Sequence, residues 1–348
     1  MEKILRNIGV SMGYKFNAFH GVTVIIPTNR SQCMEAIIDQ SITKYNGLLF
    51  RFAIYDSSEG SAICEYVKRY NDLHRETPIS YTHCSPDMGG DEKAIKAIKE
   101  VTSEYFWLYG DGNLTDFDLL EKVLLREKYN TYDVLDMESA NRRGVLNQDK
   151  KKELDIIYHY DNAHEYAVRY FSHLTYWGAS IIRSSFFQQI FETDRIYVYE
   201  AHEIPWWLAC SIFDLIADAK QHKRIIHLGV LYSDSLRYNQ EKKDHGWTQD
   251  ERYYKITFSK LIEGITMMST WYPVNIKYKM IKNLWNDALV STRYLFHLRR
   301  IGNLTPYMVK KYRKEIMYVP SVYLRMKMIS SIPLGLIHIL YLIKEINK

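Results

Sequence analysis

Residues with the chemistry of a metal site follow an apolar segment in the first third of the chain. Residues 105–109 (YFWLY) are apolar and lead directly into Gly110-Asp111-Gly112-Asn113. Carboxylate and amide oxygens bind hard cations such as Mg²⁺ and Mn²⁺, so Asp111 and Asn113 are candidate ligands. Asn113 contributes no charge, which lowers the expected metal affinity. All four residues also form turns readily, so a simple turn is the alternative interpretation.

Two histidines are weaker candidates for the same chemistry. His227 precedes a strand-like segment, and His245 lies within the polar, charged residues 233–247, which we interpret as a candidate lid over a bound ligand. Either histidine is a candidate third metal ligand or diphosphate contact. A lone histidine is more often a surface residue or a hydrogen-bonded core residue, and both interpretations stay open for each.

The elements that must position these residues follow from an alternation of apolar and amphipathic segments. Apolar runs predict strands at residues 22–27, 50–55, 79–84 and 105–109, and helical spacing predicts helices at residues 31–44, 61–73, 91–101 and 116–126. This order is typical of βαβ units and a mainly parallel sheet. Ligands bind beyond the carboxyl ends of such strands. We therefore expect the loops that begin at Thr28, Asp56 and Gly110 to share one crevice at this edge of the sheet.

Beyond about residue 130 the rhythm changes. Strands are predicted at residues 154–160, 177–182 and 225–232, with helices at residues 163–171, 184–191 and 204–219. From residue 251 the pattern is helical, with breaks at prolines. We predict an N-terminal extension at 1–21 and an α/β domain at 22–270, whose pattern changes at about residue 130. A basic helical region follows at 271–348.

Composition excludes several classes of protein. The 348 residues are 47% hydrophobic and 25% charged, which is normal for a folded chain and unlike a disordered or collagen-like one. The four cysteines form no C-x-x-C pair, so a cysteine zinc site is not expected, and scattered thiols favour a reducing cytosol. We see no signal peptide, and the apolar residues 332–343 are too short to span a bilayer. We expect a cytoplasmic protein.

Four segments together resemble a family 2 glycosyltransferase of the GT-A fold. They are VTVIIPTNR at 22–30, FAIYDSSEGS at 52–61, MGGDEKAIKAIKEVTSEYFWLYGDGN at 88–113 and WGASIIRSSFF at 177–187. Their order and spacing carry the resemblance, which covers roughly residues 20–235. It implies an α/β fold with a Rossmann-like, mainly parallel sheet flanked by helices, followed here by the basic helical region. In that fold residues 22–270 would be the catalytic domain, with a nucleotide-sugar half at about 22–130 and an acceptor half at about 131–250. The chain departs from the metal-binding D-x-D motif of the family at Asn113.

The resemblance implies a nucleotide-binding role for residues near the ends of the first strands. Asp56 would accept a hydrogen bond from the uracil of UDP, or serve a dTDP-sugar equally well, and Asp91 would contact the nucleoside. Both aspartates could instead cap the helices that follow them. Arg30 and Lys93 would contact the diphosphate, or be exposed without a role. The full set is Pro27, Thr28, Arg30, Asp56, Asp91, Lys93 and Asp111.

The same resemblance implies catalytic and acceptor residues in the second half of the domain. Glu203, in YEAHEIPWW, matches the position of the general base, with Glu200 as the alternative. The base would take the proton of the acceptor hydroxyl while that hydroxyl attacks from the opposite face, which gives inversion. Glu203 could equally be an ordinary acid of the first helical turn. Trp177 and Trp206 are candidate sugar-stacking residues, and Mn²⁺ or Mg²⁺ is the implied cofactor.

The formal net charge of +5 is unevenly distributed. Residues 277–348 hold 14 lysines and arginines but only three acids, so they carry about +11, whereas the preceding residues carry about −6. Apolar stretches flanked by Lys and Arg are typical of helices that lie on an anionic membrane surface. This suits an acceptor carried on a lipid pyrophosphate. The alternatives are that the helices pack on the catalytic body or form the interface of a homo-oligomer.

The sequence therefore predicts an inverting glycosyltransferase that uses a nucleotide-diphosphate sugar, with UDP as the expected nucleotide, in the synthesis of surface polysaccharide or glycolipid. A nucleotidyltransferase of similar fold is disfavoured because the loop at residues 28–32 contains no glycine. A nucleic-acid-binding protein is disfavoured because the basic region lacks a recognisable binding signature. A sugar-binding protein without catalysis stays open because of Asn113.

Overall fold

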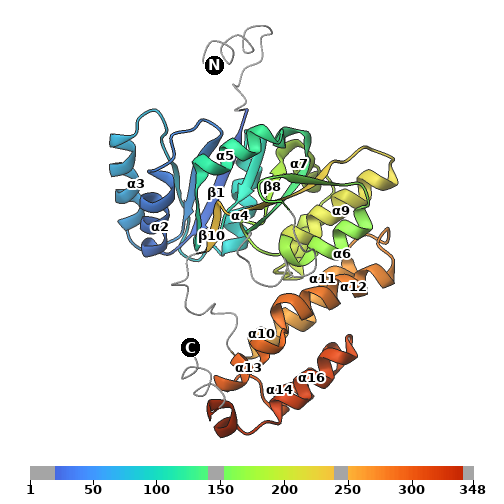
Figure 1. Cartoon of the computed structure of the whole chain (residues 1–348). Coiled ribbons are helices and arrows are strands. Elements are labelled where there is room, and N and C mark those ends of the chain that lie inside the picture. The colour runs from blue at the N-terminus through green and yellow to red at the C-terminus, as the bar shows by residue number, and fades with distance from the viewer. Residues whose placement is uncertain (1–19, 140–152, 239–249, 340–348) are drawn as a thin grey trace.

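A mixed sheet of eight strands forms the centre of the protein. The computed structural model describes residues 20–139, 153–238 and 250–339. The strand order is β3-β2-β1-β4-β8-β6-β9-β7, and helices cover both faces (Figure 1). The strands of this sheet are β1 Val22–Thr28, β2 Phe50–Asp56, β3 Ser80–His83, β4 Tyr105–Leu108, β6 Val134–Ser139, β7 Ile157–Tyr160, β8 Ser180–Arg183 and β9 Leu228–Ser233. The short strands β5 (Asn113–Thr115) and β10 (Leu236–Tyr238) pair antiparallel with each other.

Helices connect the strands in both halves of the sheet. In the first half they are α2 Ser31–Ile37, α3 Ala62–Leu73, α4 Gly90–Glu100 and α5 Phe117–Arg126. In the second half they are α6 Ala163–Leu174, α7 Ser184–Glu192, α8 Arg195–Ala201 and α9 Trp207–Gln221. Local sequence explains where several of them begin. The side chain of Asp116, for example, accepts a hydrogen bond from the amide of Leu119 at 3.0 Å and so caps α5.

The two faces of the sheet bury separate apolar clusters. Strand β1 contributes to both, because successive side chains of a strand point to opposite faces. Ile25 joins the cluster that contains α4, α6 and α9, whereas Val24 and Ile26 join the cluster that contains α2, α3 and α5. A strand buried on both faces reads as a continuous apolar run, which is why residues 22–27 were recognisable from sequence.

The predicted α/β class is confirmed, and the main omission is a strand. Strand β6 was missed because Asp136 and Glu138 interrupt its apolar residues. The strand predicted from residue 177 begins instead at Ser180, because Gly178 takes a left-handed backbone conformation with φ of +101°. The sheet is parallel across β3-β2-β1-β4 and β6-β9, while β8 and β7 run antiparallel to their neighbours.

The C-terminal helices extend one of the two apolar cores. They are α10 Asp250–Tyr254, α11 Leu261–Met267, α12 Val274–Leu284, α13 Thr292–Arg300, α14 Pro306–Lys311, α15 Arg313–Ile316 and α16 Pro320–Ser330. Figure 1 shows α11 and α12 beside α6 and α9, with α13, α14 and α16 further from the sheet. Asn283 of α12 donates a hydrogen bond to the carbonyl of Val168 in α6 at 2.9 Å. The division at residue 270 stays a prediction, because these helices share a core with the sheet.

Two further features of the described residues concern the cysteines and the length of the apolar helices. All four cysteines carry free thiols, so no disulfide links the described elements. In the ranges that the structure describes, no helix is both long enough and apolar enough to cross a bilayer.

Candidate functional site

The carboxyl ends of β1, β2 and β4 bring the predicted nucleotide residues to one edge of the sheet. Strand β1 pairs in parallel with β2, with Thr28 opposite Asp56, and also with β4, with Ile25 opposite Leu108. Asp111 therefore follows β4 at the level where β1 and β2 end. The register explains why residues far apart in sequence meet at this edge, as the sequence predicts.

Asp111 is held by two residues from the loop after β1. Its Oδ2 accepts hydrogen bonds from Thr28 Oγ1 at 2.9 Å and from Arg30 Nε at 2.9 Å, while Arg30 Nη2 pairs with Oδ1. Asp111 is 9% exposed. The pKa of Arg30 is raised above its ordinary value, mainly by this hydrogen bond to Asp111. The guanidinium of Arg30 therefore pairs with both oxygens of Asp111, the carboxylate that the sequence predicts as a metal ligand.

Lys93 lies beneath this edge as a buried cation. Its Nζ donates to the carbonyl of Thr28 at 2.6 Å and to Ser57 Oγ at 2.7 Å, so it ties the end of β1 to the end of β2. Burial lowers the pKa of Lys93 below its ordinary value, and the nearby groups Cys84, Asp56 and Asp111 oppose that shift. The alternative that Lys93 is exposed is wrong, because it is only 3% exposed, and its contact with a diphosphate stays a prediction.

Asp56 is fully buried at the end of β2 and organises the loop that follows. Its Oδ1 accepts from the amide of Ser58 at 2.8 Å, and its Oδ2 accepts from Ser58 Oγ and from Tyr81 Oη, both at 2.9 Å. An ionised carboxylate has about four acceptor sites. The three donors leave capacity for one further hydrogen bond, such as the one that the resemblance implies from uracil.

Asn113 and Trp177 meet across the edge. Asn113 Nδ2 donates to the carbonyl of Trp177 at 3.1 Å, so the carbonyl end of the amide is the end that a cation would use. A Cβ at Gly178 would lie 2.3 Å from this Nδ2. The loop of Trp177 also passes over α4, where a Cβ at Gly90 would lie 3.1 Å from the Trp177 ring. The close approach needs glycine at Gly178, whose φ is +101°, whereas a Cβ at Gly90 would require the Trp177 ring to shift by a few tenths of an ångström.

Asp91 links the nucleotide half to the helices of the acceptor half. It lies in the first turn of α4, and its Oδ1 accepts a hydrogen bond from Trp207 Nε1 at 2.9 Å. The carboxyl keeps solvent-exposed surface although many protein atoms surround it. Desolvation raises its pKa, the Trp207 bond opposes this, and the charge of Glu200 raises it further. Glu200 is therefore electrostatically close to the nucleotide side.

Glu203, the predicted base, is exposed and follows α8 in a left-handed conformation with φ of 50°. Its carboxylate pairs with Lys255 Nζ at 3.4 Å across an exposed contact. Such a backbone conformation is uncommon outside glycine and costs free energy. The sequence interpretation of Glu203 as an acid in the first turn of a helix is wrong, since α9 begins four residues later at Trp207.

Two other predicted residues lie away from this edge. Trp206 is 7% exposed within the apolar core, and its Nε1 donates to the carbonyl of Ile256 at 3.4 Å. His227 lies just before β9, whose direction matches that of β6 and, through β8, that of β4. It is therefore at the amino end of the parallel strands, opposite Asp111. His245 lies outside the described residues.

Comparison with known proteins was made on sequence and on structure. No protein-family model matches the chain, and no curated protein sequence matches it. Solved structures do. The crystal structure of S. aureus TarS 1-349 matches with a TM-score of 0.53 at 12% identity, covering 89% of this chain and 90% of that chain. The structure of S. aureus TarS 1-349 in complex with UDP-GlcNAc matches with a TM-score of 0.52 at 12% identity over the same shares.

The chain has the GT-A fold. The longer crystal structure of S. aureus TarS agrees, with a TM-score of 0.52 at 14% identity, covering 87% of this chain and 50% of that chain. At such low identity the likeness shows the fold, and the fold that the sequence resemblance implied is confirmed. The roles of individual residues stay predictions.

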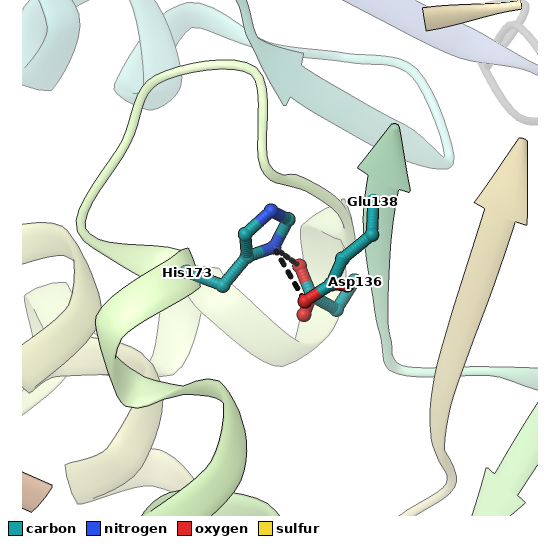
Figure 2. Close-up of side chains that lie close together, drawn as sticks. All are labelled: Asp136, Glu138 and His173. Carbon is teal, nitrogen blue, oxygen red and sulfur yellow. Dashed lines mark hydrogen bonds and ion pairs between the residues drawn. The ribbon is translucent and has the colours of Figure 1, made fainter. Parts of the chain in front are cut away.

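This GT-A fold also contains a group of three side chains that the sequence did not reveal. Asp136 and Glu138 on β6 and His173 in the last turn of α6 point toward one another (Figure 2). His173 Nδ1 lies 2.6 Å from Asp136 Oδ1 and 4.0 Å from Glu138 Oε1. All three side chains are at most 3% exposed. The sequence signal for this strand was the alternation in VLDMES. Leu135 and Met137 face one side of the sheet, and the two acids face the other.

Proposed function

We propose that this protein is an inverting glycosyltransferase of the family 2 type that moves a hexose from a UDP-sugar to an acceptor hydroxyl. The observation that carries the proposal is the interlocked group of Thr28, Arg30, Lys93 and Asp111 at the carboxyl ends of β1 and β4, with Asp56 at the end of β2. In open α/β sheets, this edge is where ligands bind. The TarS structure with UDP-GlcNAc supports a UDP-sugar as the donor.

The donor's nucleotide and diphosphate would occupy separate parts of this edge. Asp56 is fully buried, so its remaining acceptor capacity would receive the N–H of uracil once Tyr81, whose Oη bonds to Oδ2, turns aside. Arg30 is 43% exposed at its side chain and can turn from Asp111 toward a diphosphate. Lys93 is locked by its two hydrogen bonds, so it would contribute charge rather than direct contact. In this proposal Arg30 binds the diphosphate, whereas Lys93 holds the ends of β1 and β2 together.

A divalent cation fits Asp111 and Asn113, which offer one carboxylate and one amide oxygen. Mn²⁺ or Mg²⁺ prefers such oxygen ligands and would neutralise the diphosphate leaving group. Because Arg30 already contacts Asp111 through both oxygens, cation binding and Arg30 compete for one carboxylate. We expect Arg30 to move to the diphosphate as the cation takes its place. His227 contributes nothing to this centre, because it lies at the opposite edge of the sheet.

The base would be a carboxylate on or after α8. Glu203 is exposed and is held in a strained conformation, which is frequent at functional positions. Glu200 raises the pKa of Asp91 through its charge and is therefore near the nucleotide side. Glu203 remains our first assignment and Glu200 the alternative. Trp177, which packs on Gly90, is the remaining candidate for sugar stacking, since Trp206 is buried in the core.

The acceptor would be presented at a membrane surface, as part of surface polysaccharide or glycolipid synthesis. Helix α16 exposes Leu324 at 56% and Met328 at 58%, one helical turn apart, and the next segment exposes Leu336 at 49%. Lys327 is exposed between the first two. Residues 316–339 contain no acid. Exposed apolar side chains interleaved with basic ones suit anionic lipid.

Vesicle sedimentation tests this surface. The full chain should sediment with vesicles that contain phosphatidylglycerol and not with pure phosphatidylcholine. Leu324→Ser with Met328→Ser should release it, whereas Lys220→Glu with Lys223→Glu, at and just after the C-terminal end of α9, should not. Equal binding to both vesicle types, or an unchanged Leu324/Met328 variant, would remove the membrane from the proposal and leave the glycosyltransferase unaffected.

A thermal-shift panel of nucleotide sugars with and without Mn²⁺ tests the activity class. A ligand that binds only the folded state raises the melting temperature according to its concentration and affinity. UDP-sugars should raise it in the presence of Mn²⁺, and Asp111→Asn should abolish that shift. Asp72→Asn, an exposed aspartate on α3, is the control. A stabilisation by nucleoside triphosphates but not by UDP-sugars would favour a nucleotidyltransferase.

A further inference from the structure

We propose that Asp136, Glu138 and His173 form a second divalent-metal site, distinct from the Asp111–Asn113 centre and specific for a first-row transition metal such as Mn²⁺ or Zn²⁺. The three residues come from two elements, β6 and the last turn of α6. Figure 2 shows the imidazole Nδ1 facing both carboxylates. The site would be structural, because its three side chains are buried between β6 and α6, whereas the proposed donor residues lie at the ends of β1, β2 and β4.

The distances suit a shared cation. One oxygen of each acid and one nitrogen of His173 lie within 4.8 Å of one another. Ligand atoms at about 2.1 Å from a metal are at most about 4.2 Å apart. The His173 Nδ1 distances of 2.6 Å and 4.0 Å already fall within that limit. Two ligands at a right angle on such a metal are about 3.0 Å apart, so the 2.6 Å pair of His173 Nδ1 and Asp136 Oδ1 must open by a few tenths of an ångström. Any pair of ligand atoms further apart than about 4.2 Å must close to that limit, and rotation of the side chains supplies both changes.

The donor set determines which cations fit. With a neutral imidazole the three side chains sum to −2, and a divalent cation brings that sum to zero. On binding, Nδ1 would coordinate the metal while the imidazole proton occupies Nε2. Imidazole nitrogen favours zinc and its first-row neighbours, whereas Mg²⁺ and Ca²⁺ prefer sites made of oxygen alone. The Asp111–Asn113 pair has no nitrogen ligand, so the two centres differ in chemistry.

Position gives the site a function. His173 ends α6 just before the loop that carries Trp177 and Gly178, and the amide of Met137, between the two acids on β6, donates to the carbonyl of Ala179 at 2.7 Å. The same loop accepts the Asn113 hydrogen bond at Trp177. A metal between β6 and α6 would therefore fix the loop against which Asn113 is placed. We infer that this second metal positions a ligand of the first.

Metal analysis and Mn²⁺ electron paramagnetic resonance on the full chain test the proposal in an Asp111→Asn background. That background removes the other centre and needs no activity. After equilibration with Mn²⁺ or Zn²⁺ and removal of excess metal, we expect about one equivalent to be retained. The bound Mn²⁺ should show electron spin-echo modulation from a coordinated ¹⁴N nucleus, which only a histidine ligand provides here. Mg²⁺ should compete poorly.

Two variants and a control decide the outcome. His173→Ala should lose the metal and the ¹⁴N signal. Glu138→Gln, a conservative change that keeps the side-chain volume, should weaken binding about tenfold or more, since one anionic ligand is lost. The control is Asp161→Asn, which alters an exposed Asp–His pair spaced 2.8 Å from His159. Absence of bound metal in the Asp111→Asn protein, or unchanged binding in folded Glu138→Gln, would overturn the site and leave a metal-free triad.

Discussion

The nucleotide half and the acceptor half of this molecule differ in how their candidate residues are held. In the nucleotide half, Asp111, Arg30 and Lys93 are joined by short hydrogen bonds to the ends of β1 and β2. In the acceptor half, Glu203 makes one exposed ion pair and Trp206 lies in the core. The residues of the nucleotide half are therefore held in place by the protein itself, whereas those of the acceptor half would be ordered when donor and acceptor bind.

This difference follows from the elements that carry the residues. Parallel strands end at a common level, so the strand register alone brings the loops after β1, β2 and β4 close together. Residues on and after α8 have no such constraint, because a helix can shift along its axis. Preorganisation of the nucleotide half should make donor binding robust, and catalysis should depend on few residues in the acceptor half.

The largest effect should come from the base. Glu203→Gln removes the proton acceptor while keeping the shape of the side chain, so turnover should fall by about 10²- to 10⁴-fold. UDP binding should be unchanged, because the nucleotide half does not use this residue. A sugar-transfer assay with parallel calorimetry measures both.

Glu200→Gln is the matched variant for that experiment. If Glu203→Gln keeps wild-type turnover and Glu200→Gln loses it, the alternative base is correct. If neither changes turnover, the acceptor half carries no carboxylate base on or just after α8, and the proposed inverting mechanism fails.

A second prediction concerns the loop that joins the halves. Gly178→Ala places a Cβ on a residue with φ of +101° and 2.3 Å from Asn113 Nδ2. The strain should lower the free energy of unfolding by about 1–3 kcal/mol and displace the Asn113 amide. Denaturant unfolding measures the first effect and Mn²⁺ titration the second. Gly60→Ala, where no atom lies within 4 Å of the added Cβ, is the control.

Arg30→Ala should separate metal binding from nucleotide binding. Without Arg30, Asp111 loses the forked cation that occupies both of its oxygens. Mn²⁺ should then bind several-fold more tightly in the absence of nucleotide, while UDP binding weakens by about 1–3 kcal/mol through loss of a charged contact. Calorimetric titrations of each ligand alone distinguish the two effects. Parallel weakening of both would mean that Arg30 holds the edge in shape rather than competing for Asp111.

The smallest effect is a pH dependence at Asp91. Its pKa is raised in the folded state, chiefly by desolvation. The folded protein therefore holds this proton more tightly than the unfolded chain, and stability is lost as pH rises through the folded pKa. Asp91→Asn cannot lose that proton. The free energy of unfolding of the variant, relative to wild type, should increase as pH rises from about 3.8. A pH-independent difference would contradict the raised pKa.

The sequence predicted the first half of the protein better than the second, for a physical reason. Segments such as residues 22–27 and 105–109 are apolar because both faces of their strands are buried. The sequence therefore predicts each strand, the residue at which it ends and the polar residue that follows. Strand β6 was hidden because its buried acids resemble a surface pattern. The core position of Trp206 could not be read either, since the sequence does not show which helix covers which face.

Calorimetric titration of UDP in the presence of Mn²⁺ tests the central claim most directly, with wild type compared to Asp56→Ala and Asp111→Asn. The account predicts that wild type binds UDP, that Asp56→Ala weakens binding by about 1–3 kcal/mol, and that Asp111→Asn removes the dependence on Mn²⁺. Wild-type protein that binds no UDP with Mn²⁺ present, or variants that bind it as wild type does, would contradict a nucleotide-sugar site at this edge of the sheet.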